Sequence, residues 1–266
     1  MTPVASRREA GHGNRSGEVT HRLAWWTDDG RSAGLLRLMV PTDGPAQLEL
    51  GLVGTGEPCM LVTDHAVPPP TGGGLEVRTS GLWAEVVVEE APAPGRGHMS
   101  AGLEAFGMVL DDPDEAWRGG PDHQFRGDRV PVGLDLGAEA VGDPVVRRWG
   151  LGVPCRLDGE VLVADRVLDV DGWAWWLVGE PPPGNDLVMA RADDDSWVLA
   201  TGEAARRWGE STSEGELLVG PSPDGAIGRA PVLIEWAGRE LRVDRWFGSM
   251  IGPDDRTGVG WRELSA

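Results

Sequence analysis

Few side chains in this sequence are placed for catalysis, and a buried carboxylic acid is the best candidate. Glu104 lies among apolar neighbours in the run Leu103-Glu104-Ala105-Phe106-Gly107. A carboxyl group that faces an apolar interior has a raised pKa and can act as a general acid near neutral pH. The alternatives are that Glu104 faces water or pairs with an arginine. Asp171 is a weaker candidate, because an Asp-Gly pair before a strand is also an ordinary turn.

Other motifs of catalytic or cofactor sites are incomplete. The run Gly30-Arg31-Ser32-Ala33-Gly34 matches the GxSxG pattern of a nucleophile elbow. An elbow needs a helix after the serine, whereas a strand-like run follows here, so we interpret this segment as a hairpin turn. The five histidines stand in no metal-ligand spacing, and the chain has no lysine for a phosphate-binding loop. We therefore expect no metal and no nucleotide cofactor.

A cluster of tryptophans is the most distinctive apolar pattern. Residues two apart on a strand share a face, so we predict that Trp173 and Trp175 line a ligand cavity. Trp176 is then expected on the opposite face, in a sheet interface. In the first half, Trp83 is predicted as a cavity wall and Glu104 as an acid or carbonyl-polarising donor. The alternative is that all four tryptophans are ordinary core residues.

The strands that would position these residues follow from the composition. The 40 glycines and 21 prolines separate short apolar stretches, which is typical of many short strands. No βαβ alternation is visible, which argues against a parallel sheet. The predicted fold class is all-β, with two tandem antiparallel lipocalin-like β-barrel domains. We predict a disordered tail at residues 1–20, a first domain at 21–145 and a second at 146–266, joined near 137–148.

Charge and cysteine content restrict the partners and the compartment. A net charge of −19 argues against binding to nucleic acid or to an anionic membrane surface. No apolar run approaches the roughly 18 residues that a membrane span needs. The first 20 residues lack a hydrophobic signal core, so we expect a cytoplasmic protein. Cys59 and Cys155 form no zinc or CxxC spacing and are predicted to be buried free thiols.

Several segments together carry a resemblance to a known family. They are Gly81-Leu82-Trp83, residues 102–107 with Leu110-Asp111-Asp112-Pro113, residues 129–136, residues 154–161 with Val170-Asp171-Gly172, and residues 257–261. These segments resemble the hydroxyneurosporene synthase-like (carotenoid 1,2-hydratase-like) proteins. The resemblance implies two packed lipocalin-like barrels with a ligand site inside or between them. It also implies one of two activities: that of a hydratase, which protonates a double bond of a polyene, or that of a cofactor-independent cyclase of the Diels–Alderase kind.

The chain departs from that family's pattern directly after the Asp-Gly turn. Many relatives carry a polar run with Arg, Asp and His there, whereas this chain has the tryptophan-rich run 173–179. Cyclisation needs an apolar cavity that holds a reactive chain folded, with one hydrogen-bond donor at most. We therefore predict a cofactor-independent cyclase or isomerase of a hydrophobic polyketide or terpenoid. A hydratase that uses a buried acid and a non-catalytic carrier of a hydrophobic metabolite are the alternatives.

Overall fold

The strands that the structure describes form two antiparallel sheets. The computed structural model describes residues 19–54, 57–70, 74–111, 126–179, 186–208, 219–220, 228–229, 232–236, 239–253 and 256–265. Within these residues the one helix is α2 (Glu203–Arg206), which follows the glycine Gly202. No helix in this part of the chain is both long and apolar enough to cross a membrane.

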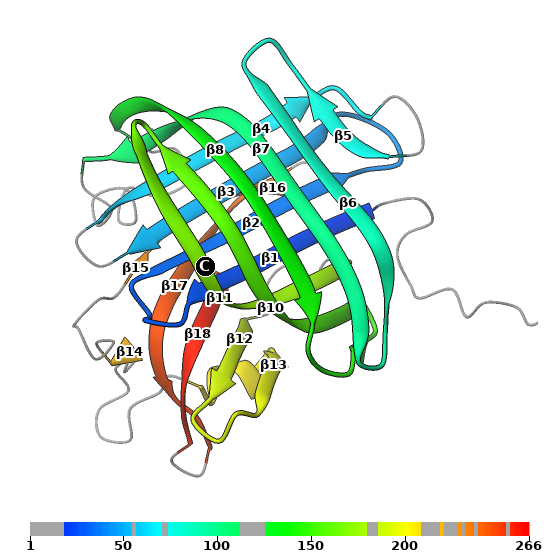
Figure 1. Cartoon of the computed structure of the whole chain (residues 1–266), viewed down its shortest axis with the longest axis vertical. Helices are drawn as coiled ribbons and strands as arrows, with labels where there is room; N and C mark the ends of the chain where they lie inside the picture. Colours follow the sequence, from blue (N-terminus) through cyan, green and yellow to red (C-terminus); the bar gives the residue numbers. More distant parts are fainter. Residues whose placement is uncertain are drawn as a thin grey trace, which may run out of the picture.

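The first sheet closes into a barrel. Its strands are β1 (Val19–Thr27), β2 (Ser32–Val40), β3 (Ala46–Gly54), β4 (Glu57–Val67), β5 (Leu75–Arg78), β6 (Leu82–Ala93), β7 (Arg96–Leu110), β8 (Gly127–Ala140), β9 (Val145–Arg147), β10 (Gly150–Val163) and β11 (Arg166–Gly179). Pairing runs in the order β4-β3-β2-β1-β11-β10-β8-β7, and β4 then pairs with β7 at Met60–Val109 and Leu61–Met108. This ring of eight strands has the size that encloses one small ligand in lipocalins (Figure 1).

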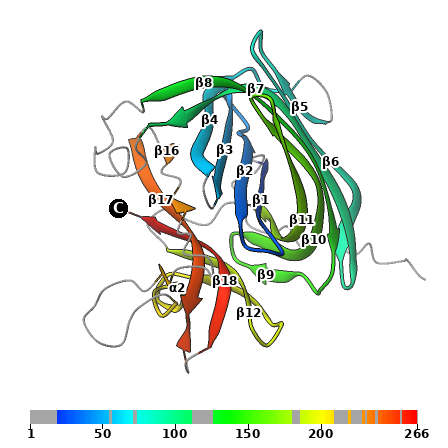
Figure 2. The same ribbon diagram turned by 60° about the vertical axis from the view of Figure 1, so that its left-hand side comes forward.

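The second sheet lies against one side of the barrel. It contains β12 (Leu187–Ala192), β13 (Trp197–Thr201), β14 (Val219–Gly220), β15 (Gly228–Arg229), β16 (Val232–Trp236), β17 (Arg239–Ile251) and β18 (Thr257–Ser265). Its path is β13-β12-β18-β17-β14, with β15 and β16 also paired to β17. Figure 2 shows β17 and β18 on the side of the barrel that β1 to β4 form, away from β6.

Burial along each strand follows from this arrangement. In β7, buried and more exposed positions alternate through most of the strand, because one face packs in the barrel and the other faces solvent. By contrast, nearly every residue of β1, β2 and β3 is buried. Their inner face fills the barrel and their outer face packs against the second sheet, so these strands lose the clear alternation.

Three apolar clusters hold the layers together. The inner cluster fills the barrel and includes Leu23, Leu50, Leu103 and Trp176. The second cluster lies between the barrel and the second sheet and includes Trp26, Trp175, Phe247, Trp261 and Leu187. A smaller third cluster packs α2 against the far face of the second sheet.

The predicted all-β class with antiparallel strands is confirmed: the first sheet closes into a barrel, and the second is a separate antiparallel sheet. Most predicted strands are found within a few residues of their expected ends. The predicted boundary at residues 145 and 146 does not coincide with the change of sheet. Strands β10 and β11 pair with β8 and β1, so the first sheet continues to Gly179. The physical reason is that β11 pairs with the edge of β1 that would otherwise expose unpaired backbone groups.

Candidate functional site

An apolar cavity of about 180 Å³ lies at one end of the barrel. At this end β1, β3, β7 and β10 finish, and β2, β4, β8 and β11 begin. Its lining consists of Trp25, Ser32, Ala33, Leu52, Val53, Met60, Val109, Val130, Val161, Val163, Ala164, Arg166, Leu168 and Val170. Among the described residues that line it, every side chain apart from Ser32 and Arg166 is apolar. The cavity is therefore a candidate site for a small hydrophobic ligand.

Close packing fixes the indole of Trp25 in the cavity wall. Trp25 in β1 lies opposite Gly34 in β2, and it is 1% exposed. A Cβ atom at Gly34 would lie 2.0 Å from Cζ2 of this indole, so the ring rests directly on the glycine backbone. The sequence places glycine here because any side chain would displace the ring.

The hairpin tip between β10 and β11 supplies most of the opposite wall. Val161, Val163, Leu168 and Val170 alternate along the two strands and point to the inner face. Ala164 turns the chain with a φ of 57°, and its amide donates to the Pro131 carbonyl at 2.8 Å. That bond attaches the tip to β8.

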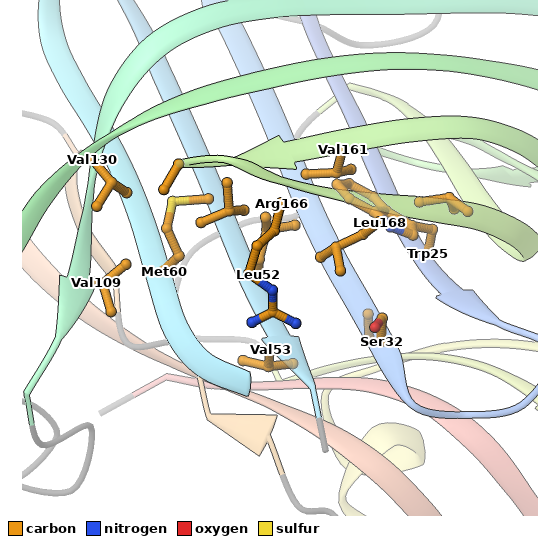
Figure 3. A pocket seen from close by; sticks show the side chains of 14 residues that line it. Trp25, Ser32, Leu52, Val53, Met60, Val109, Val130, Val161, Arg166 and Leu168 are labelled. Carbon is orange, nitrogen blue, oxygen red and sulfur yellow. The ribbon is translucent and has the colours of Figure 1, made fainter. Parts of the chain in front are cut away.

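Two polar side chains contact the cavity. Figure 3 shows the guanidinium of Arg166 extending among the lining side chains, on the side where Val53 and Ser32 lie. A guanidinium stays protonated at all ordinary pH values and presents several N–H donors. Arg166 and Ser32 can therefore donate hydrogen bonds to a carbonyl or carboxylate of a ligand whose apolar part fills the cavity.

The turn between β1 and β2 places Ser32 at the rim. Gly30 adopts a φ of 66° and its amide donates to the carbonyl of Thr27 at 2.9 Å, as a tight turn requires. The Thr27 hydroxyl donates to Asp29, which lowers the pKa of that carboxyl. The GxSxG segment is thus a hairpin turn, as the sequence predicted, with strand β2 after Ser32 and not the helix of a nucleophile elbow.

Trp173 and Trp175 lie outside the barrel cavity. As their spacing predicts, both lie on one face, but this face packs against the second sheet. The Trp175 indole is fully buried and donates to the Ala190 carbonyl at 3.3 Å. The ring of Trp173 is half-buried, with the guanidinium carbon of Arg191 4.1 Å from its centroid. The two residues therefore join the sheets in this structure.

Trp176 occupies the inner face instead. Its indole N–H donates to Nδ1 of His21 at 3.1 Å, and both side chains are buried in the barrel. Burial lowers the pKa of His21 to about 4, so the imidazole is neutral near pH 7. The expected positions of Trp175 and Trp176 are thus exchanged. Spacing fixes which tryptophans share a face, but it does not tell which face is inside the barrel.

Trp83 and Glu104 lie opposite one another on the outer face of β6 and β7. The side chain of Glu104 is exposed, so of the two orientations that the sequence left open, the structure shows the one that faces water. Its strand alternates as predicted, but Leu103 and Ala105 take the inner face. The Trp83 indole donates to Glu76 at 3.1 Å. A role of these residues in ligand binding or catalysis stays a prediction. Their position outside the cavity argues against such a role.

Asp171 is also on the surface. It is exposed and, together with Asp28, accepts hydrogen bonds from the Arg156 guanidinium, which raises the pKa of that arginine. Cys59 and Cys155 are free and buried, as predicted, and burial raises the pKa of each thiol to about 12. Among the described residues, no three His, Cys, Asp or Glu side chains are grouped to hold a metal ion.

The sequence reasoning missed a set of buried charged residues between the two sheets. Arg37 and Glu49 are 1% and 0% exposed and form an ion pair at 3.2 Å, and Nε2 of His65 lies 3.3 Å from the same Glu49 oxygen. Arg22 pairs with Glu263 of β18 at 2.6 Å. The signal that would have found them is a lone charge inside an apolar strand, as in Leu-Leu-Arg-Leu-Met of β2 and Leu-Glu-Leu of β3.

No protein-family model and no curated protein sequence matches the chain. Among solved structures, kievitone hydratase from Nectria haematococca is 11% identical, with a TM-score of 0.40 over 94% of this chain and 88% of that chain. CghA with Sch210972 is 9% identical, with a TM-score of 0.43 over 94% of this chain and 89% of that chain. At these identities and scores, the likeness assigns neither a family nor an activity to the chain.

Proposed function

We propose that the cavity at the barrel end binds a small apolar molecule with one carbonyl group, and that the chain acts on it as a cofactor-independent cyclase or isomerase. The observation that carries this proposal is the lining of the cavity, whose described residues are apolar except for Ser32 and Arg166. An enclosed apolar site holds a flexible chain in a folded conformation, and one donor polarises its carbonyl.

The cavity volume limits the size of the ligand. Cavities of about 150 Å³ accept benzene, whereas sites for drug-sized ligands have roughly 300–1,000 Å³. At about 180 Å³, this cavity fits one ring or a short branched chain. We therefore propose a terpenoid or polyketide fragment of that size, or a longer molecule of which one end enters the barrel while the rest lies at the rim.

A binding experiment tests the site first. Acetophenone and ethylbenzene have the same ring, but only acetophenone has a carbonyl. Replacement of Val161 by Phe fills the cavity, so we expect calorimetric binding of both compounds to be lost. Arg166→Met replaces the guanidinium by an apolar side chain of similar length. We expect this variant to bind acetophenone about 10-fold more weakly and to bind ethylbenzene as the wild type does. Unchanged binding of both compounds to the Val161→Phe variant would contradict the proposal.

Turnover then separates an enzyme from a carrier. A linear polyene ketone is incubated with and without the protein, and the rate and the product distribution are measured. A cyclase or isomerase changes at least one of them, and the Val161→Phe variant removes that change. The carrier alternative is supported by the lining, because none of the described residues that line the cavity carries a carboxylate or an imidazole. Binding without a change of rate or product would favour the carrier.

The hydratase alternative rests on a different place in the fold. Glu49 is a fully buried carboxylate, and it contacts the partly exposed imidazole of His65 at the edge of the layer between the sheets. The same carboxylate pairs with the Arg37 guanidinium at 3.2 Å. In this alternative His65 would donate a proton to one carbon of the double bond, water would add to the other carbon, and the proton that this water loses would return to His65. Incorporation of ¹⁸O from water into the product, lost in a His65→Gln variant, would support this alternative.

A further inference from the structure

The outer face of β5, β6, β7, β8, β10 and β11 carries an apolar row next to an acidic row. Pairing of the strands places Arg78, Trp83, Glu104, Gly133, Leu162 and Val167 in one line across the sheet. The next line along the strands contains Glu76, Glu85, Gly102, Asp135, Glu160 and Asp169. We call Trp83, Leu162 and Val167 the apolar row, and Glu85, Asp135, Glu160 and Asp169 the acidic row.

The apolar row is part of a groove. Two adjoining hollows of about 760 and 450 Å³ share Trp83, Glu104, Gly133 and Leu162. Gly102 and Gly133 lower the floor, and the Trp83 ring lies over Gly102, where a Cβ atom would come within 2.7 Å of it. Leu162 and Val167 are 37% and 58% exposed. Exposed apolar side chains around a hollow mark an interaction site more often than single exposed residues do.

The acidic row destabilises the sheet that carries it. Asp135 lies directly opposite Glu160, and Glu160 lies directly opposite Asp169. Side chains at such positions are about 5 Å apart, and like charges there repel each other. Among the described residues, none of these three carboxylates forms an ion pair. A cationic partner would reduce this repulsion, so the acidic row is less destabilising in a complex with such a partner than in the free protein.

We propose that this face binds a partner protein through a segment that is both basic and apolar. Successive lines of side chains on one face of a strand are about 7 Å apart. The partner therefore needs an arginine or lysine at about this distance from an apolar anchor, as an amphipathic helix provides with residues three or four apart. A second copy of this chain, which also has a net charge of −19, is a poor occupant of an acidic surface.

The test uses two synthetic helical peptides of equal length and charge. One has leucine on one face with arginines beside it, and the other has asparagine in place of each leucine. We expect wild-type protein to bind the leucine peptide about 10-fold more tightly at 0.15 M salt, measured by fluorescence anisotropy. Equal binding of the two peptides would overturn the proposal, because charge alone would then explain it.

Two triple variants with the same net charge locate the contact. The first neutralises the acidic row by Asp135→Asn, Glu160→Gln and Asp169→Asn. The second neutralises the exposed Asp43, Asp143 and Asp193 elsewhere on the surface. We expect the first variant to bind the leucine peptide about 10-fold more weakly than wild type, and the second less than 2-fold more weakly. Equal losses in the two variants would overturn the proposal.

Two further measurements test the apolar contact and the repulsion within the acidic row. Neither depends on charged contacts with the peptide. A Leu162→Ala, Val167→Ala variant should bind the leucine peptide more weakly than wild type and bind the asparagine peptide with unchanged affinity. In the absence of peptide, neutralising the acidic row should raise the melting temperature, because the repulsion between opposed carboxylates is removed. A lower melting temperature would contradict the strain on which the proposal depends.

Discussion

The indole of Trp25 packs directly against Gly34 in the neighbouring strand, and this contact sets the position of the cavity wall. Replacement of Gly34 by alanine puts a methyl group where Cζ2 of the ring now lies. The ring must move into the cavity or the strands must separate. We expect a loss of about 1–3 kcal/mol in the free energy of unfolding, together with weaker binding of ethylbenzene.

The matched control is Gly74→Ala, because a Cβ atom at Gly74 meets no atom within 4 Å. Urea unfolding and calorimetric binding are measured for both variants. If Gly34→Ala kept full affinity for ethylbenzene, the assignment of Trp25 to the wall of a functional cavity would be wrong.

His21 makes stability depend on pH. Its pKa is about 4 in the folded protein and about 6.5 in the unfolded chain, because burial disfavours the imidazolium. Its contribution is fully present above pH 6.5 and is lost as the pH falls toward 4, since the unfolded state then binds the proton more readily. The full difference corresponds to about 3 kcal/mol.

A His21→Gln variant keeps an acceptor for the Trp176 indole and removes the titrating group. We expect its free energy of unfolding to fall less than that of wild type between pH 7 and pH 4.5, as measured in urea. His98→Gln is the control, because His98 is exposed. Equal pH dependence of the wild type and the His21→Gln variant would show that His21 is not the group responsible.

Trp175 distinguishes a residue that joins the sheets from a residue that binds ligand. Its burial and its bond to Ala190 predict that Trp175→Ala costs about 3–5 kcal/mol of stability. Hydrogen exchange should increase in β12 more than in β7 and β8, while the folded protein keeps its affinity for acetophenone. Lost affinity with unchanged stability would instead support the sequence-based assignment of Trp175 to a ligand site.

The buried pair of Arg37 and Glu49 should be strongly coupled. Glu49→Leu removes the carboxylate that pairs with the Arg37 guanidinium, and we expect a loss of about 3–5 kcal/mol. The double variant Arg37→Met, Glu49→Leu should recover most of this loss. A double-mutant cycle in urea measures the coupling energy. Additive losses would mean that the two side chains contribute independently.

Local sequence determined the strands and their faces. Glycine and proline mark most strand ends, and alternation along β7 correctly pairs Leu103 with Ala105 on one face and Glu104 with Phe106 on the other. The turn at Gly30 and the buried cysteines also follow from local chemistry, because each depends on neighbouring residues or on side-chain polarity alone.

Only the tertiary structure decided which face of each strand is inside. Glu104 faces solvent and Trp176 faces the barrel because strands distant in sequence, β1 with β11 and β4 with β7, close the ring. Closure also brings Trp25, Met60 and Val161 together around one cavity, and the second sheet buries Arg37 and Glu49. A period of two separates the faces of a strand but does not identify the face that is buried, because that depends on what packs against each one.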